Sequence, residues 1–134
     1  MEFVKMYGPL VGRVLLALIF IIAGFGKITG FEGTVGYMQA YNVPMTQVLA
    51  VIAIIIELAG GIMIAVGWKA RWGAAAIFIF VLVASVIFHA FWAVPADQAQ
   101  LQNIMFMKNL AIMGGMLYII AYGPGPYSLG KDKC

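Results

Sequence analysis

Charged residues are scarce in this chain of 134 residues, and hydrophobic residues are not. Charged residues make up 10% of the sequence and hydrophobic residues 64%. A soluble domain of this size has too little polar surface in such a composition to cover its core. The composition therefore excludes a soluble globular protein and predicts an integral membrane protein, whose first partner is the lipid bilayer.

Cysteine and histidine are almost absent. The one cysteine, Cys134, is the last residue, and the one histidine is His89. A lone thiol forms no disulfide, no Cys-x-x-Cys redox pair and no cysteine-ligated metal site within one chain, and one histidine does not make a zinc site. We therefore predict no metal and no covalent cofactor, and we interpret Cys134 as an incidental terminal thiol.

The positive net charge does not indicate nucleic-acid binding. The formal charge of +3 comes from eight cations and five acids. The cations stand at the ends of apolar runs and form no basic patch, so nucleic acid is excluded as a partner.

Lys5 before an apolar run also resembles a signal peptide. That run is longer than a usual signal core and ends in Gly-Phe-Gly-Lys instead of Ala-x-Ala, so we expect a retained helix.

Four apolar runs predict four membrane-spanning helices in a single domain over residues 1–134. Each run is close to the ~20 residues that cross a hydrocarbon core of ~30 Å. The expected spans are residues 9–28, 44–67, 73–93 and 103–122, with Pro9 and Pro44 in the first turns and a polar connection over 94–102. The predicted fold class is an all-α membrane protein, a four-transmembrane-helix bundle.

The segment between the first two spans is too polar to cross the membrane. Residues Phe31, Val35, Met38 and Tyr41 recur at helical spacing on one side of it. Such a pattern predicts a short helix that lies in the membrane interface. Two roles are open for this helix, a plain connection between two spans and a lid over a substrate.

Two pairs of adjacent glycines indicate an internal repeat. Gly60-Gly61 follows Glu57 in the second span, and Gly114-Gly115 lies in the fourth span. Both spans would run in the same direction, which allows two parallel-repeat hairpins. Helix packing alone also produces paired glycines.

Helical periodicity predicts which face of each span is buried. The expected stripes are Arg13, Ala17, Phe20, Gly24 and Lys27 on the first span, Ala53, Glu57, Gly60, Gly61, Ile64 and Gly67 on the second, Phe78, Leu82, Ser85, His89 and Trp92 on the third, and Lys108, Ala111, Gly115, Tyr118 and Tyr122 on the fourth.

The distribution of cations predicts the orientation. Four spans place both termini and the loop around residue 70 on one side. The cations expected on that side are Lys5, Lys69, Arg71, Lys131 and Lys133, against Lys27 and Lys108 on the other. By the positive-inside rule both termini are cytoplasmic, as in a bacterial inner-membrane protein.

Glu57 is the most informative single residue, because about 13 residues of its span precede it and about 10 follow it. A carboxylate near the bilayer midplane is protonated, paired with a cation or functional. Its candidate partners are Arg13 from the inner side and Lys27 or Lys108 from the outer side. The pair either locks the helix register or belongs to a ligand site.

The ligand-site interpretation places a pocket in the outer half of the membrane. Polar residues would hydrogen-bond the head of a quinone or a lipid, and small and aromatic residues would accept its apolar body. The candidate ligand-binding residues are Glu57, Lys108, Asn109, His89, Lys27 and Arg13. No Ser/His/Asp set, glycine-rich phosphate loop or carboxylate pair is present, so no catalytic residue is predicted and enzymatic activity is left open.

Four motifs in a fixed order resemble the DoxX family of bacterial inner-membrane proteins. They are Gly24-Phe25-Gly26-Lys27, Glu57-Leu58-Ala59-Gly60-Gly61, Met107-Lys108-Asn109-Leu110 and Gly123-Pro124-Gly125-Pro126. The resemblance implies a four-helix inner-membrane protein. The family takes its name from a subunit of thiosulfate:quinone oxidoreductase, and other members are linked to membrane redox or oxidative-stress complexes.

The resemblance implies a quinone- or lipid-interacting subunit of a membrane redox system, which works with a redox partner subunit or as a homo-oligomer. No thiosulfate chemistry is recognisable in this sequence. Two other interpretations remain open. One is a non-catalytic assembly or scaffold protein, in which the charges lock the bundle, and the other is a small proton-coupled transporter with Glu57 as the proton carrier.

Overall fold

The computed structural model describes residues 1–130, so Cys134 and the tail cations Lys131 and Lys133 lie outside the described residues. Over residues 1–130 the chain forms helices and no strand. Four of the helices are long and apolar enough to cross a membrane. The structure thus confirms the predicted all-α fold with four candidate spans.

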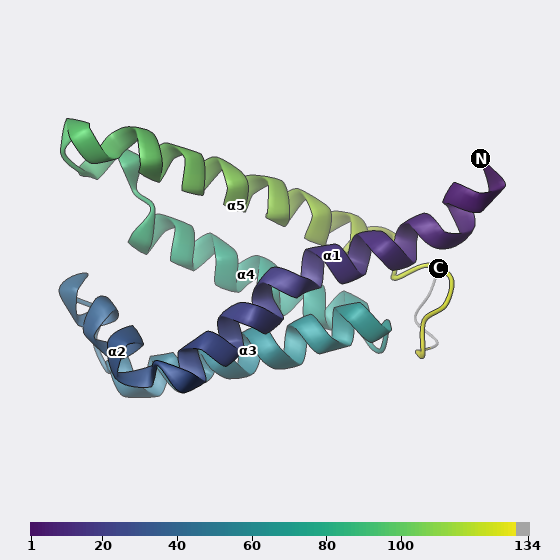
Figure 1. Ribbon diagram of the computed structural model, residues 1–134, viewed down its shortest axis with the longest axis horizontal. Coiled ribbons are helices and arrows are strands. Elements are labelled where there is room, and N and C mark those ends of the chain that lie inside the picture. The colour runs from purple at the N-terminus through teal and green to yellow at the C-terminus, as the bar shows by residue number, and fades with distance from the viewer. Residues whose placement is uncertain (131–134) are drawn as a thin grey trace.

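Residues 1–130 form five α-helices and one short 3-10 turn. They are α1 (Glu2–Thr29), α2 (Phe31–Ala40), α3 (Thr46–Val66), α4 (Ala70–Phe88), the short 3-10 turn η1 (Phe91–Ala93) and α5 (Ala96–Tyr122) (Figure 1). Helix α1 packs on α3, α3 on α4, and α4 on α5. Figure 1 shows α3 and α5 diverging toward the end of the bundle at which α2 lies.

Two helices extend well beyond the predicted spans. Helix α1 begins at Glu2, so Pro9 lies inside it instead of in its first turn. Helix α5 begins at Ala96, directly after Pro95, with Asp97 in its first turn. Proline and an acidic residue both favour a helix N-terminus. The polar residues that we expected to connect the last two spans therefore form the first turns of α5.

The buried faces of α1 and α3 are the predicted ones. Helix α1 buries Arg13, Ala17, Phe20 and Gly24. Helix α3 buries Ala53, Glu57, Gly60, Gly61 and Ile64 from the predicted stripe, together with Thr46 and Ala50. On both helices the inward face carries a charged residue and small residues, whereas the other faces are mostly bulky and apolar. This difference in residue type is what predicts the inward face.

The buried faces of α4 and α5 are rotated from the predicted stripes. Helix α4 buries Ile77, Val81 and Ser85, and Leu82 is exposed. Helix α5 buries Asn109, Met113, Met116 and Ile119, and Lys108 is exposed. Of the predicted residues, Ser85 alone is fully buried on these two helices. Lipid and protein interior are both apolar, so the hydrophobic pattern of such helices does not distinguish their two faces.

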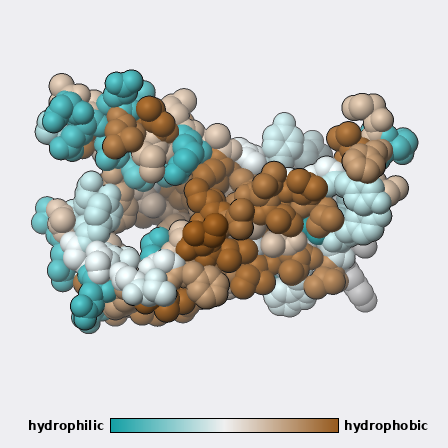
Figure 2. All heavy atoms as spheres, in the orientation of Figure 1, coloured by the Kyte–Doolittle hydropathy of each residue, from teal (hydrophilic) through white to brown (hydrophobic). Residues whose placement is uncertain are grey.

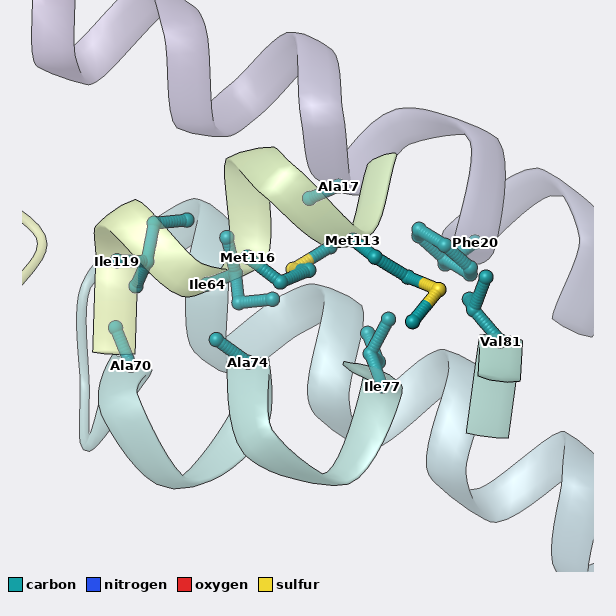
Figure 3. Close-up of a cluster of buried hydrophobic side chains, with 10 residues drawn as sticks. All are labelled: Ala17, Phe20, Ile64, Ala70, Ala74, Ile77, Val81, Met113, Met116 and Ile119. Atoms are coloured by element: carbon teal, nitrogen blue, oxygen red, sulfur yellow. The ribbon is translucent and has the colours of Figure 1, made fainter. Parts of the chain in front are cut away.

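The core fills the half of the bundle away from α2. It consists of Ala17, Phe20, Ile64, Ala70, Ala74, Ile77, Val81, Met113, Met116 and Ile119 (Figure 3). Helices approach closely here because of glycine. A Cβ atom on Gly60 would lie 2.9 Å from Ile77 Cγ1, and one on Gly61 would lie 2.9 Å from Ile21 Cγ1. The other glycine pair differs in part, because a Cβ placed on Gly114 would meet open space, whereas one on Gly115 would lie 3.2 Å from Leu16 Cδ2.

Candidate ligand-binding cavity

A cavity of about 720 Å³ lies at the α2 end of the bundle. All five α-helices contribute to its wall, and Figure 2 shows the molecule hollowed between the part that carries α2 and the part that carries the start of α5. Most of its lining is apolar. Of the six candidate residues, five line it, namely Lys27, Glu57, His89, Lys108 and Asn109.

Lys27 of α1 and Glu57 of α3 form an ion pair in the cavity wall. Lys27 Nζ lies 2.7 Å from Glu57 Oε1. Glu57 is 3% exposed. One turn before Lys27, a Cβ atom on Gly24 would lie 2.6 Å from Leu58 Cγ, so glycine is what lets α1 come this close to α3. The partner of Glu57 is therefore Lys27, and neither Arg13 nor Lys108.

The carboxylate of Glu57 is not saturated by this pair. Oε1 has no well-aligned hydrogen bond despite its short distance to the ammonium group, and within residues 1–130 Lys27 is its one charged partner. A carboxylate accepts up to about four hydrogen bonds, and an ammonium group donates three. The pair therefore retains both acceptor and donor capacity beside the cavity.

Asn109 links α5 to α4. Its Nδ2 donates to Ser85 Oγ at 2.9 Å, and Ser85 Oγ donates to the carbonyl of Val81 at 2.7 Å. Asn109 and Ser85 are both buried. This chain of hydrogen bonds sets the register of the two helices, and it places the neighbouring Lys108 on the cavity side of α5.

His89 directly follows the last residue of α4, and its ring contacts a residue that was not among the predicted site residues. Its Nδ1 lies 2.8 Å from Oε1 of Gln102. Gln102 belongs to the segment expected to be a connection, and the early start of α5 brings it back beside His89. The ring contacts of Phe91 and Trp92 with Phe106 anchor the turn that follows His89 to α5.

Helix α2 forms one wall of the cavity and is held against α4 by aromatic rings. The ring centroid of Phe88 lies 5.3 Å from that of Tyr37 and 5.0 Å from that of Tyr41. Burial, together with the hydroxyl of Tyr41, raises the pKa of Tyr37 to about 12. Tyr37 and Met38 line the cavity, so α2 encloses the site as well as joining α1 to α3.

Arg13 lies at the other end of the bundle and does not reach this cavity. Its Nε donates to the carbonyl of Ala65 at 3.2 Å, and its Nη1 donates to the carbonyls of Pro124 and Pro126 at 3.0 Å each. Its Nη2 donates to the carbonyl of Tyr127. Arg13 thereby ties α1 and α3 to the segment after α5, beside a second cavity of about 410 Å³.

Within residues 1–130, no group of three or more His, Cys, Asp or Glu side chains could hold a metal ion.

Comparison with known proteins adds a family. The family model that describes DoxX matches residues 8–90. The chain is 38% identical over 122 residues to the inner membrane protein YphA of Escherichia coli, covering 91% of this chain and 87% of YphA. It is 40% identical over 124 residues to the inner membrane protein YqjF of the same organism, covering 92% of this chain and 90% of YqjF.

A more distant likeness reaches a eukaryotic protein. The chain is 30% identical over 131 residues to a Surfeit locus protein 4 homolog of Schizosaccharomyces pombe, covering 96% of this chain and 38% of that protein. No solved structure matches the chain. The family match covers more than half of the sequence, both Escherichia coli relatives are inner membrane proteins, and residues 1–130 contain four candidate spans. The chain is therefore an integral inner-membrane protein and belongs to the DoxX family.

Proposed function

We propose that this protein binds one quinone from the membrane in the cavity at the α2 end, as a subunit of a membrane redox system. The observation that carries the proposal is the Lys27–Glu57 ion pair in the wall of an otherwise apolar cavity of about 720 Å³. Cavities that bind small molecules commonly measure about 300–1,000 Å³, with a few polar groups in an apolar lining.

The cavity matches the two parts of a quinone. The carbonyl oxygens of the ring accept hydrogen bonds, which the ammonium groups of Lys27 and Lys108 can donate. The apolar tail can lie along the aliphatic and aromatic side chains that α3, α4 and α5 contribute, among them Ile52, Phe80 and Ile112. A lipid headgroup with acceptor oxygens offers the same chemistry to the lysines, so the experiment below separates the two sources.

In this proposal the chain binds and orients the quinone, and a partner subunit or a second copy of the chain takes part in its oxidation or reduction. The scaffold interpretation requires no cavity, because the ion pair alone is enough to hold α1 against α3. The transporter interpretation requires a path to Glu57 from both sides. The packed core of Ala17, Phe20 and Met113 lies between the cavity and the end that carries Arg13, which favours a binding role.

Filling the cavity should expel the ligand. Ala84 lines the cavity on α4, and Ala76 is exposed on the same helix. Ala84→Phe should lower the quinone that copurifies with the detergent-extracted protein by about tenfold, because overpacking costs about 1–3 kcal/mol. Mass spectrometry of the organic extract, scaled to protein amount, measures the quinone, and Ala76→Phe is the control that retains it.

The same extract distinguishes the ligands. A defined phospholipid that A84F loses and A76F keeps would identify the occupant as a lipid and would overturn the quinone proposal. Recovery of neither a quinone nor a defined lipid from the unaltered protein would contradict any ligand role for the cavity.

We also propose that both termini face the cytoplasm and that the cavity lies in the outer half of the membrane. The proposal follows from Lys5, Lys69 and Arg71, which stand at the end opposite Lys27. In a Cys134→Ser background, Asp97→Cys should react with a membrane-impermeant maleimide in spheroplasts, and Trp72→Cys should react only after permeabilisation. Both side chains are exposed, so the reverse labelling pattern would invert the orientation.

A further inference from the structure

The contact between His89 and Gln102 determines which ring nitrogen of His89 carries the proton. The 2.8 Å contact joins His89 Nδ1 to Oε1 of the Gln102 amide. An amide oxygen only accepts hydrogen bonds, so Nδ1 must be the donor. A neutral imidazole has one N–H, and its second nitrogen is then an acceptor. In the neutral form of His89, Nε2 is consequently a hydrogen-bond acceptor.

That acceptor is available to a ligand. His89 is half-buried and lines the cavity. Its Nε2 has no hydrogen-bond partner among the described residues, and this nitrogen is not fully buried. The backbone N–H of His89 donates to the carbonyl of Ser85 at 3.1 Å, which fixes the residue at the end of α4. The backbone of His89 and its Nδ1 are therefore both held in place, and Nε2 is left to contact a ligand.

We propose that Gln102 is a positioning residue that holds His89 in the Nδ1–H tautomer, and that the cavity consequently prefers a hydroquinone to the corresponding quinone. This inference rests on the proposed function. The cavity then offers two acceptors, His89 Nε2 and the carboxylate of Glu57, besides the donors Lys27 and Lys108. Each hydroxyl of a hydroquinone both donates and accepts, so it can satisfy both kinds of group.

A quinone satisfies the lysines alone. Its carbonyl oxygens donate nothing, so on binding they would leave His89 Nε2 without a donor and would add no hydrogen bond to the carboxylate of the Lys27–Glu57 pair. A site built to accept from a hydroxyl discriminates against an analogue that lacks it, because the buried acceptor then loses its partner. One such hydrogen bond corresponds to an affinity ratio of up to about tenfold.

The tautomer can be measured without any ligand. The chain has one histidine, so ¹⁵N-histidine labelling gives a single imidazole spectrum. In the neutral form of the ring we expect Nδ1 to be protonated and Nε2 to be unprotonated. Gln102→Glu keeps an acceptor beside Nδ1 and should preserve this pattern, whereas Gln102→Leu should move the proton to Nε2. A proton on Nε2 in the unaltered protein would overturn the inference.

The preference is tested with a decyl-substituted benzoquinone and its hydroquinone, titrated anaerobically into the purified protein. We expect the hydroquinone to bind about tenfold more tightly, and we expect the ratio to fall toward one in Q102L and His89→Phe and to persist in Q102E. Melting temperatures confirm that each variant is folded. Equal binding of both forms to the unaltered protein would overturn this inference alone, and binding of neither would overturn the proposed function.

Discussion

Replacing Glu57 with glutamine should lower the free energy of unfolding by about 3 kcal/mol, because it leaves the ammonium group of Lys27 without a counter-charge inside the bundle. Lys27 Nζ lies 2.7 Å from Glu57 Oε1, and the side chains of Lys27 and Glu57 are 27% and 4% exposed. The partial exposure of Lys27 places the expected loss at the low end of the values for buried pairs, about 3–5 kcal/mol. Thermal or denaturant-induced unfolding of the detergent-purified protein measures it.

A double-mutant cycle isolates the pair. Lys27→Met alone should destabilise at least as strongly as Glu57→Gln, since it leaves the more deeply buried carboxylate unpaired. The double variant should be more stable than the sum of the two single effects predicts, because it removes both charges together. Additive losses would show that the two side chains are not coupled, and an unchanged melting point of E57Q would show that Glu57 is already neutral.

Replacing Arg13 with methionine should destabilise the protein by about 3 kcal/mol or more. Its guanidinium group donates to carbonyls of Ala65, Pro124, Pro126 and Tyr127. A hydrogen bond to a charged group contributes about 1.5–3 kcal/mol, and the variant would remove all four bonds, of which the one to the carbonyl of Pro124 is buried. Arg13→Lys should recover part of the loss, because one ammonium group donates to fewer carbonyls than the guanidinium fork.

Hydrogen exchange localises the effect of R13M. The amides of Leu129 and Gly130 donate to the carbonyls of Val66 and Gly67 at 3.0 and 2.9 Å. We expect these two amides to exchange faster in R13M, whereas the amides around the distant cavity keep their protection. Ligand copurification should be unchanged, because Arg13 does not line that cavity. Loss of the ligand without loss of stability would place Arg13 in the binding site and would contradict the structure.

The sequence predicts the fold because the membrane restricts the alternatives. Long apolar runs must be helices in lipid, so the number of spans follows from composition. The inward faces of α1 and α3 also follow, because Arg13 and Glu57 cannot face lipid without a large cost in free energy. Helix α4 is apolar on nearly every face, and α5 carries many of its polar residues in its first turns. Their buried faces therefore depend on the contact of Asn109 with Ser85, which joins residues far apart in the sequence.

The sequence predicts most of the polar residues that line the cavity, but it does not predict which of them contact one another. Depth in the membrane identified Lys27, Lys108 and Arg13 as possible partners of Glu57, but the choice of Lys27 depends on the close approach of Gly24 to Leu58. Gln102 was missed because its polar neighbours read as a loop. Tyr37 was missed because the interfacial helix could be placed in the sequence but not against Phe88.

Photo-crosslinking shows directly whether a quinone occupies the cavity at the α2 end. A benzoquinone with a diazirine in its tail is added to membranes that contain the protein, and labelled peptides are mapped by mass spectrometry. We expect a strong reduction of labelling in A84F but not in A76F. The labels should be concentrated on residues of the cavity wall, namely Tyr37, Met38, Ala84, Ile87, Phe88, Lys108, Asn109 and Ile112. Labels spread over the outward-facing surface, at Ile22, Ile79 and Leu117, and equal in both variants, would contradict the proposed binding site.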